Sequence, residues 1–305
     1  MKSRRYPETS HVRLRAIKSA FTAEGALCGA TLYVPEGTLP DQELPTILML
    51  GGWGSIQRAL TSSFTHSFVE AGFAVMEFDY PGWGDSGGFP RQGINPWRRT
   101  RVADAALAYL KSQPMVAAHQ ITLWGTSFGG GHVVDLASQH PELKGAIIQV
   151  PMLDGLAATL ATPPGRLLKL IFLGTLDQIK PGGPIYIPTL AREGQFGTMD
   201  RDGAWDALEI ALDDWKYGSY DNRVAAKSVL TMPFYRPWRR LKDVKIPMLM
   251  IGATRDTVAP FVSDKVQRVG NPHVQVIEVD ANHFDPYFDP LFPEVLAHQL
   301  NFLRR

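Results

Sequence analysis

Short runs of apolar residues alternate along this chain with segments in which apolar residues recur at helical spacing. The apolar runs, each of strand length, are residues 46–50, 73–78, 121–124, 146–150, 248–251 and 274–279. The helical patterns cover residues 58–71, 97–112, 128–139, 260–269 and 291–303. Strands that are apolar throughout must be covered on both faces. The alternation therefore predicts an α/β fold, a mostly parallel sheet between two layers of helices.

The N-terminal region has a different pattern. Residues 13–21 and 26–34 form two further strand-like runs, and the second alternates in polarity and ends at Pro35. Alternation of this kind is typical of a half-buried strand. We therefore expect the sheet to begin with an antiparallel hairpin.

A long segment in the second half of the chain interrupts the strand–helix alternation. At 305 residues the chain is long enough for one domain with an insertion or for two domains. Between residues 151 and 241 the alternation stops, and a structureless loop of that length is implausible in a compact domain. We predict an α/β core at residues 1–151 and 241–305 and a mostly helical cap at residues 152–240. The aromatic residues of the cap are expected to form its own core or to line a pocket: Phe172, Tyr186, Phe196, Trp205, Trp215, Tyr217, Tyr220, Phe234, Tyr235 and Trp238.

The charge balance argues against several classes of partner. The chain has 31 Lys and Arg residues against 30 Asp and Glu, so it lacks the basic excess of a nucleic-acid-binding protein. Its local basic clusters, at residues 98–101 and 236–240, are interpreted as solvated helix faces. No run approaches the roughly 20 apolar residues that cross a bilayer. We expect a small-molecule substrate, with no nucleic-acid or membrane partner. A homodimer is compatible with the sequence, which does not determine the oligomeric state.

Cysteine and histidine usage limits the cofactors and the compartment. Cys28 is the only cysteine, which excludes a disulfide within the chain and a cysteine-rich metal site. No pair of histidines has the spacing of metal ligands, so no metal and no cofactor are expected. The basic residues Arg4 and Arg5 are not followed by an apolar segment, as they would be in a secretion signal. These features predict a cytoplasmic protein.

The strongest local motif is Gly125-Thr126-Ser127-Phe128-Gly129, which lies directly between an apolar run and a helical pattern. A sharp strand-to-helix turn strains the serine backbone and leaves no room for side chains two residues to either side, which requires glycine there. The helix that begins at this turn directs free N–H groups and the positive end of its dipole toward the serine. We predict that Ser127 is a nucleophile. The alternative is an ordinary glycine-rich turn.

A nucleophilic serine requires a base, and the base requires an acid that orients it. With a turn of this kind the order along the chain is serine, acid, histidine. Asp256 and His283 each follow an apolar run, where strand ends converge on a ligand site, so they are the predicted acid and base. Asp154, which follows another run, is the alternative acid. His132 lies one turn into the helix after Ser127 and is expected to be a packing residue.

Two N–H groups are needed to stabilise an oxyanion at the reacting carbon. Phe128 follows the nucleophile and is predicted to supply the first N–H group. The glycine-rich loop at residues 51–55 is expected to supply the second through Trp53, unless it is a plain glycine turn. A further glycine-rich loop at residues 79–88 lacks the Gly-Lys-Ser/Thr of a P-loop, so we interpret it as a structural turn.

Three blocks of this sequence together resemble the α/β-hydrolase superfamily. They are Phe-Asp-Tyr-Pro-Gly-Trp-Gly-Asp-Ser-Gly-Gly at residues 78–88, Leu-Trp-Gly-Thr-Ser-Phe-Gly-Gly-Gly-His at 123–132 and Ala-Asn-His-Phe-Asp-Pro-Tyr at 281–287. The combination is similar to the subgroup labelled Xaa-Pro dipeptidyl-peptidase-like or acyl-esterase-like, which includes relatives of fungal polyketide transferases. Many members have His-Gly where this chain has Gly51 and Gly52, which leaves the second oxyanion donor open. The large extra domains of true dipeptidyl peptidases are absent, so the resemblance does not imply peptidase activity.

These features favour a serine hydrolase that cleaves a carboxylic ester or thioester through an acyl-enzyme on Ser127. One alternative is an acyltransferase or thioesterase of a biosynthetic pathway, in which an alcohol, an amine or a carrier thiol accepts the acyl group. Another is a catalytically silent member of the superfamily that binds a ligand in the same pocket.

Overall fold

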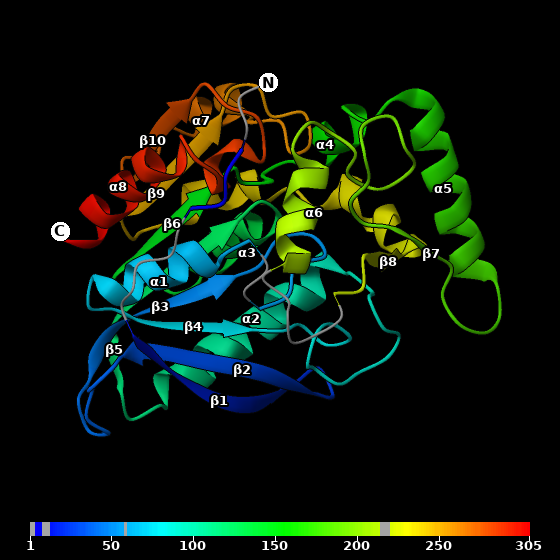
Figure 1. Cartoon of the computed structure of the whole chain (residues 1–305). Coiled ribbons are helices and arrows are strands. Elements are labelled where there is room, and N and C mark those ends of the chain that lie inside the picture. The colour runs from blue at the N-terminus through cyan, green and yellow to red at the C-terminus, as the bar shows by residue number, and fades with distance from the viewer. Residues whose placement is uncertain (1–3, 8–12, 58–59, 214–219) are drawn as a thin grey trace.

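The main sheet of the protein is mixed, with helices on both sides (Figure 1). A computed structural model describes residues 4–7, 13–57, 60–213 and 220–305, and these form an eight-stranded sheet in the order β1-β2-β4-β3-β5-β6-β9-β10. Its strands are β1 (Leu14–Ala23), β2 (Ala26–Pro35), β3 (Leu44–Leu50), β4 (Ala74–Phe78), β5 (Val116–Thr126), β6 (Gly145–Gln149), β9 (Met248–Ala253) and β10 (Val274–Val279). β2 pairs antiparallel with both β1 and β4, and the other neighbours are parallel. The predicted fold class is confirmed.

Helices cover both faces of this sheet. They are α1 (Ser62–Glu70), α2 (Pro96–Lys111), α3 (Phe128–Ala137), α7 (Ser263–Val269) and α8 (Phe292–Leu303). Along β3, Ile47 and Met49 face the core that α1 and α8 complete, whereas Leu48 and Leu50 face the core of α2, α3 and α7. Successive side chains of a strand point to opposite faces, which is why the central strands are apolar throughout.

Two predicted helices begin several residues later in the structure. The helix expected at residues 58–71 begins only at Ser62, and Arg58 and Ala59 lie outside the described residues. The helix expected at residues 260–269 begins at Ser263. Its start is delayed because the residues after β9 form a turn, in which the carboxylate of Asp256 accepts backbone N–H groups.

The segment between β6 and β9 forms a group of short elements. They are α4 (Gly155–Leu160), α5 (Pro164–Ile179), β7 (Tyr186–Pro188), α6 (Ala204–Asp213), β8 (Arg223–Ala225) and the 3₁₀ helices η1 (Ala226–Phe234) and η2 (Pro237–Asp243). β7 and β8 pair antiparallel, so the segment is not purely helical. Figure 1 shows α4, α5 and α6 on the side of the molecule toward which the arrows of β3 and β4 point. The division into core and cap remains our proposal.

The aromatic residues of this segment have different environments. Tyr235 is buried, whereas Phe172 and Phe234 are exposed. Trp215 and Tyr217 lie outside the described residues. Within the described part of the chain, no helix is both long and apolar enough to cross a membrane.

Candidate active site

Ser127 lies at the turn between β5 and α3 with φ at 53° and ψ at −123°. A positive φ is strained for any residue but glycine, and such strain persists only where the surrounding structure enforces it. A Cβ atom on Gly125 would lie 2.6 Å from Cγ2 of Val133, and one on Gly129 would lie 2.7 Å from the carbonyl oxygen of Gly51. Close packing therefore requires both glycines. At Gly129 the start of α3 packs directly against the backbone that follows β3.

The structure brings Ser127, His283 and Asp256 together. Nε2 of His283 lies 2.9 Å from Oγ of Ser127, and Nδ1 lies 2.5 Å from Oδ2 of Asp256. The other oxygen of Asp256 accepts the N–H groups of Val258 and Ala259, both at 2.8 Å. All three side chains are buried. The imidazole is thus held between a hydroxyl and a carboxylate whose own orientation the backbone fixes.

Asp154, the alternative acid, has different partners. Its carboxylate accepts the N–H groups of Leu156 at 3.0 Å and Ala157 at 3.3 Å, and so caps α4. It also forms an ion pair with Lys265. Burial by itself would raise the pKa of Asp154, but the hydrogen bonds from Lys265 and from the backbone lower the pKa on balance. These contacts turn the carboxylate toward α4 and α7 and not toward His283.

The predicted oxyanion donors lie beside Ser127. Phe128 is the first residue of α3, where N–H groups have no partner within the helix. Among the described residues, neither the N–H of Phe128 nor that of Trp53 has a hydrogen-bond acceptor. A Cβ atom on Gly52 would lie 3.3 Å from Cβ of Ser127, so the Gly52–Trp53 peptide is close to the nucleophile. Both N–H groups are therefore free to bind an oxyanion formed at Ser127.

Arg99 contacts the loop after β3, although it was predicted to lie on a solvated helix face. That interpretation was wrong for Arg99, which is 3% exposed and donates from Nη1 to the carbonyl oxygen of Gly52 at 3.0 Å. The side chains of Val102, Ala103 and Ala106 on the same helix are also buried. Arg99 precedes them at spacings of three, four and seven residues, and this periodicity was the signal in the sequence.

The loop at residues 79–88 is held together, and joined to the segment after β3, by hydrogen bonds to Asp79. Asp79 is buried and accepts the N–H groups of Gln57 at 2.8 Å and Asp85 at 2.9 Å. Burial raises the pKa of Asp79. This bonding is that of a structural turn. Within the described residues, no group of three His, Cys, Asp or Glu side chains could hold a metal ion.

Two cavities meet at Ser127. The larger has a volume of about 310 Å³, and its walls come mainly from aliphatic side chains such as Met152, Leu167, Leu170 and Leu230. The smaller has a volume of about 50 Å³ and is lined by His283, Tyr220 and Tyr287 among others. Of the cap aromatics that the structure describes, Tyr220 in the smaller cavity is the one that lines either cavity.

One part of the larger cavity is charged. Arg166 and Arg201 line it together with Asp200, which is 2% exposed. Both arginines pair with the same carboxylate oxygen, Arg201 at 2.5 Å. Since two cations share one anion, this wall of the cavity carries an excess of positive charge.

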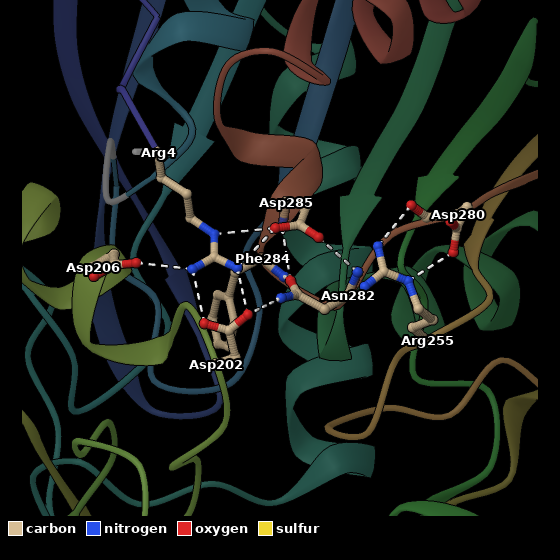
Figure 2. Close-up of polar contacts among 8 residues, drawn as sticks. All are labelled: Arg4, Asp202, Asp206, Arg255, Asp280, Asn282, Phe284 and Asp285. Carbon is tan, nitrogen blue, oxygen red and sulfur yellow. Dashed lines mark hydrogen bonds and ion pairs between the residues drawn. The ribbon is translucent and has the colours of Figure 1, made fainter. Parts of the chain in front are cut away.

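The loop that carries His283 is tied to the segment between β6 and β9 (Figure 2). Arg4 contacts Asp285, two residues after His283, at 2.9 Å. The same guanidinium contacts Asp202 at 2.7 Å and Asp206 at 2.9 Å. Hydrogen bonds from Arg4 are the main reason that the pKa of Asp202 is lowered. No local pattern indicated this link, because its members lie far apart along the chain.

Residues 45–277 match the family model for serine aminopeptidase, S33. The chain is similar to the quorum-quenching protein AidA of Acinetobacter baumannii, with 31% identity over 288 residues and 93% of each chain covered. It is also similar to a thiohydrolase of Eupenicillium brefeldianum, with 25% identity over 243 residues and 77% of each covered.

Structural similarity extends to a fungal protein. The crystal structure of the α/β-hydrolase GrgF from Penicillium sp. sh18 superimposes with a TM-score of 0.73 at 22% identity, covering 95% of this chain and 98% of that one. The polyketide transferase grgF of Penicillium sp. is 24% identical over 274 residues, with 87% of this chain and 89% of the relative covered. The predicted α/β-hydrolase fold is thus confirmed.

Proposed function

Because the chain belongs to the serine aminopeptidase S33 family of hydrolases, we propose that it cleaves a carboxylic ester or thioester through an acyl-enzyme on Ser127. The observation that carries the proposal is the pair of hydrogen bonds at His283, 2.9 Å to Ser127 and 2.5 Å to Asp256. A serine hydroxyl is a weak nucleophile at neutral pH, and this arrangement supplies the base and the orienting acid that it needs.

In the proposed reaction, Oγ of Ser127 attacks the carbonyl carbon while Nε2 of His283 takes the hydroxyl proton. The carboxylate of Asp256 stabilises the resulting imidazolium. The N–H groups of Phe128 and Trp53 bind the oxyanion. The tetrahedral intermediate collapses as His283 gives its proton to the leaving alcohol or thiol. Water then attacks the acyl-enzyme while His283 accepts its proton, and the second tetrahedral intermediate collapses as His283 returns that proton to Oγ of Ser127 and the free acid departs.

The two cavities support an assignment of the substrate's two halves. His283 must reach the leaving atom to protonate it, so the leaving group belongs in the smaller cavity, which His283 lines. The acyl group then belongs in the larger aliphatic cavity. A volume of about 50 Å³ holds a few waters, since each requires roughly 10–15 Å³. The geometry thus supports a small-molecule acyl substrate and leaves room beside His283 for the attacking water.

An active-site-directed fluorophosphonate probe tests the proposal. We expect the probe to label the wild-type protein at Ser127 and to leave Ser127→Ala unlabelled, and we expect only the wild type to hydrolyse a p-nitrophenyl ester. Val133→Ala, a matched substitution in α3 away from the hydroxyl, is expected to keep both signals. If the wild type were neither labelled nor active on esters of any acyl length, the catalytically silent alternative would replace the proposal.

Transfer to an acceptor other than water is the second candidate function. It is favoured by the relatives described as a thiohydrolase and as a polyketide transferase. Product analysis with water, an alcohol and a thiol in competition separates the two functions, because hydrolysis gives free acid whichever acceptor is present. The narrower likeness to Xaa-Pro dipeptidyl-peptidase-like enzymes, the cytoplasmic location and the lack of nucleic-acid and membrane partners remain predictions from sequence.

A further inference from the structure

Arg99 is a cation in the interior of the protein. Its side chain lies in the first turn of α2, and the residue is 3% exposed. In the described part of the chain it forms no ion pair, and its Nε and Nη2 atoms have no hydrogen-bond partner. Burial lowers the pKa of Arg99 to about 10, which still leaves it protonated at neutral pH. Because an unpaired buried charge is costly, its presence here calls for a reason.

The surroundings of Arg99 compensate only part of this cost. The guanidinium carbon lies 4.3 Å from the ring centre of Tyr80 and 5.3 Å from that of Trp83, which are cation–π distances. Asp79 acts on Arg99 electrostatically, but its oxygens are hydrogen-bonded to Gln57 and Asp85. Among the described residues, the hydrogen bond to the Gly52 carbonyl is therefore the specific polar contact of this charge.

That hydrogen bond fixes the peptide from which the second oxyanion donor comes. The carbonyl oxygen of Gly52 accepts from Arg99 at 3.0 Å and from the N–H of Ser55 at 3.3 Å. In a trans peptide the C=O and N–H groups point in opposite directions. Because Arg99 holds the oxygen, the N–H of Trp53 is directed away from Arg99, and Gly52 packs against Ser127.

We propose that Arg99 is a positioning residue for the oxyanion hole. Its side chain holds the Gly52–Trp53 peptide so that the N–H of Trp53 meets the oxyanion formed at Ser127. This inference rests on the proposed function. The charge also explains why arginine is present and not a neutral donor. A hydrogen bond from a cation polarises the peptide that accepts it, and so makes the N–H at the other end of that peptide a stronger donor.

Kinetics of Arg99→Met test this role against a structural one. Methionine fills the space but cannot donate a hydrogen bond. We expect kcat on a p-nitrophenyl ester to fall by about 10- to 100-fold, part of the roughly 10²–10³-fold that removal of an oxyanion donor costs. KM is expected to change by less than about threefold, because the oxyanion exists only after attack. Val102→Ala, which creates a cavity on the same face of α2, is the matched control and should keep kcat.

Arg99→Lys gives a second readout, which a merely structural role would not move. A buried ammonium loses its proton at lower pH than a guanidinium does, since its unperturbed pKa is about 10.4. The groups facing Arg99 are Asp79, Tyr80 and His132. Burial raises the pKa of Tyr80, and burial together with Arg99 lowers that of His132, so neither titrates near pH 7 to 9. The ratio of kcat for Arg99→Lys to kcat for the wild type should therefore be low throughout or fall as pH rises.

Two results would overturn the inference. One is a folded Arg99→Met protein with kcat within twofold of the wild type. The other, which applies even where Arg99→Met does not fold, is an Arg99→Lys protein whose kcat equals that of the wild type across this pH range. In either case activity that still depends on Ser127 would leave the proposed function standing, whereas activity retained by Ser127→Ala would refute the function itself.

Discussion

Replacing Asp256 by asparagine should place the proton of His283 on the wrong nitrogen. Oδ1 of Asp256 accepts the N–H groups of Val258 and Ala259 at 2.8 Å each, and an asparagine oxygen would keep both bonds. The amide nitrogen of the asparagine would then take the place of Oδ2, 2.5 Å from Nδ1 of His283. An amide nitrogen can only donate, so Nδ1 would become the acceptor and Nε2 would carry the proton. In that tautomer His283 cannot accept the proton of Ser127.

The expected loss follows from this tautomer. Asp→Asn at the orienting acid of a serine triad costs about 10⁴ in kcat, which is about 5.4 kcal/mol of transition-state stabilisation. Steady-state hydrolysis of a p-nitrophenyl ester measures the loss directly. The rate of fluorophosphonate labelling should fall in parallel, because attack by Ser127 needs the same proton transfer. The melting temperature should change little, since the two backbone hydrogen bonds are kept.

Asp154→Asn is the matched control, because Asp154 is the other acid that follows a strand of the sheet. Asparagine can still cap α4 but loses the ion pair with Lys265, so the replacement should lower stability by at most about 1 kcal/mol and leave kcat within threefold of the wild type. The opposite pattern, with full activity in Asp256→Asn and a large loss in Asp154→Asn, would refute the assignment of the acid.

Three further predictions concern packing, the Arg4 link and the acyl cavity. Gly129→Ala should lower the free energy of unfolding by about 1–3 kcal/mol in thermal or urea unfolding, because the added Cβ would meet backbone carbonyl oxygens. Gly165→Ala is the control, because the space around Gly165 is open, and it should keep the stability of the wild type. Equal stability of the two variants would contradict this packing. Arg4→Ala should lower the melting temperature at neutral pH. Since Arg4 lowers the folded-state pKa of Asp202, this contribution is present above the unfolded pKa of about 3.9 and is lost as pH falls through the folded value. A difference between the two proteins as large at pH 2 as at pH 7 would contradict the link. Leu170→Trp should reduce kcat/KM for octanoyl esters by at least about 10-fold and leave kcat/KM for acetyl esters unchanged, because Leu170 lines the larger cavity. Equal effects on both esters would place the acyl chain elsewhere.

Local patterns in the sequence determined the fold class and the members of the candidate site. A strand that is apolar throughout indicates burial on both faces, and glycines two residues before and two residues after a serine indicate a tight turn. Both signals depend only on near neighbours along the chain, so they can be recognised without a structure. They were sufficient to predict a mostly parallel sheet with an N-terminal hairpin, and to predict Ser127, His283 and Asp256 as a group.

Tertiary structure was needed to exclude the alternative acid, Asp154. Asp154 and Asp256 each follow a strand, but β9 pairs with β10, so Asp256 and His283 leave the sheet side by side. The hydrogen bond from Arg99 to Gly52, the aliphatic lining of the larger cavity and the Arg4 link were also beyond the sequence. Burial and hydrogen bonding depend on groups that are distant along the chain, and only the folded arrangement of strands and helices determines which of them meet.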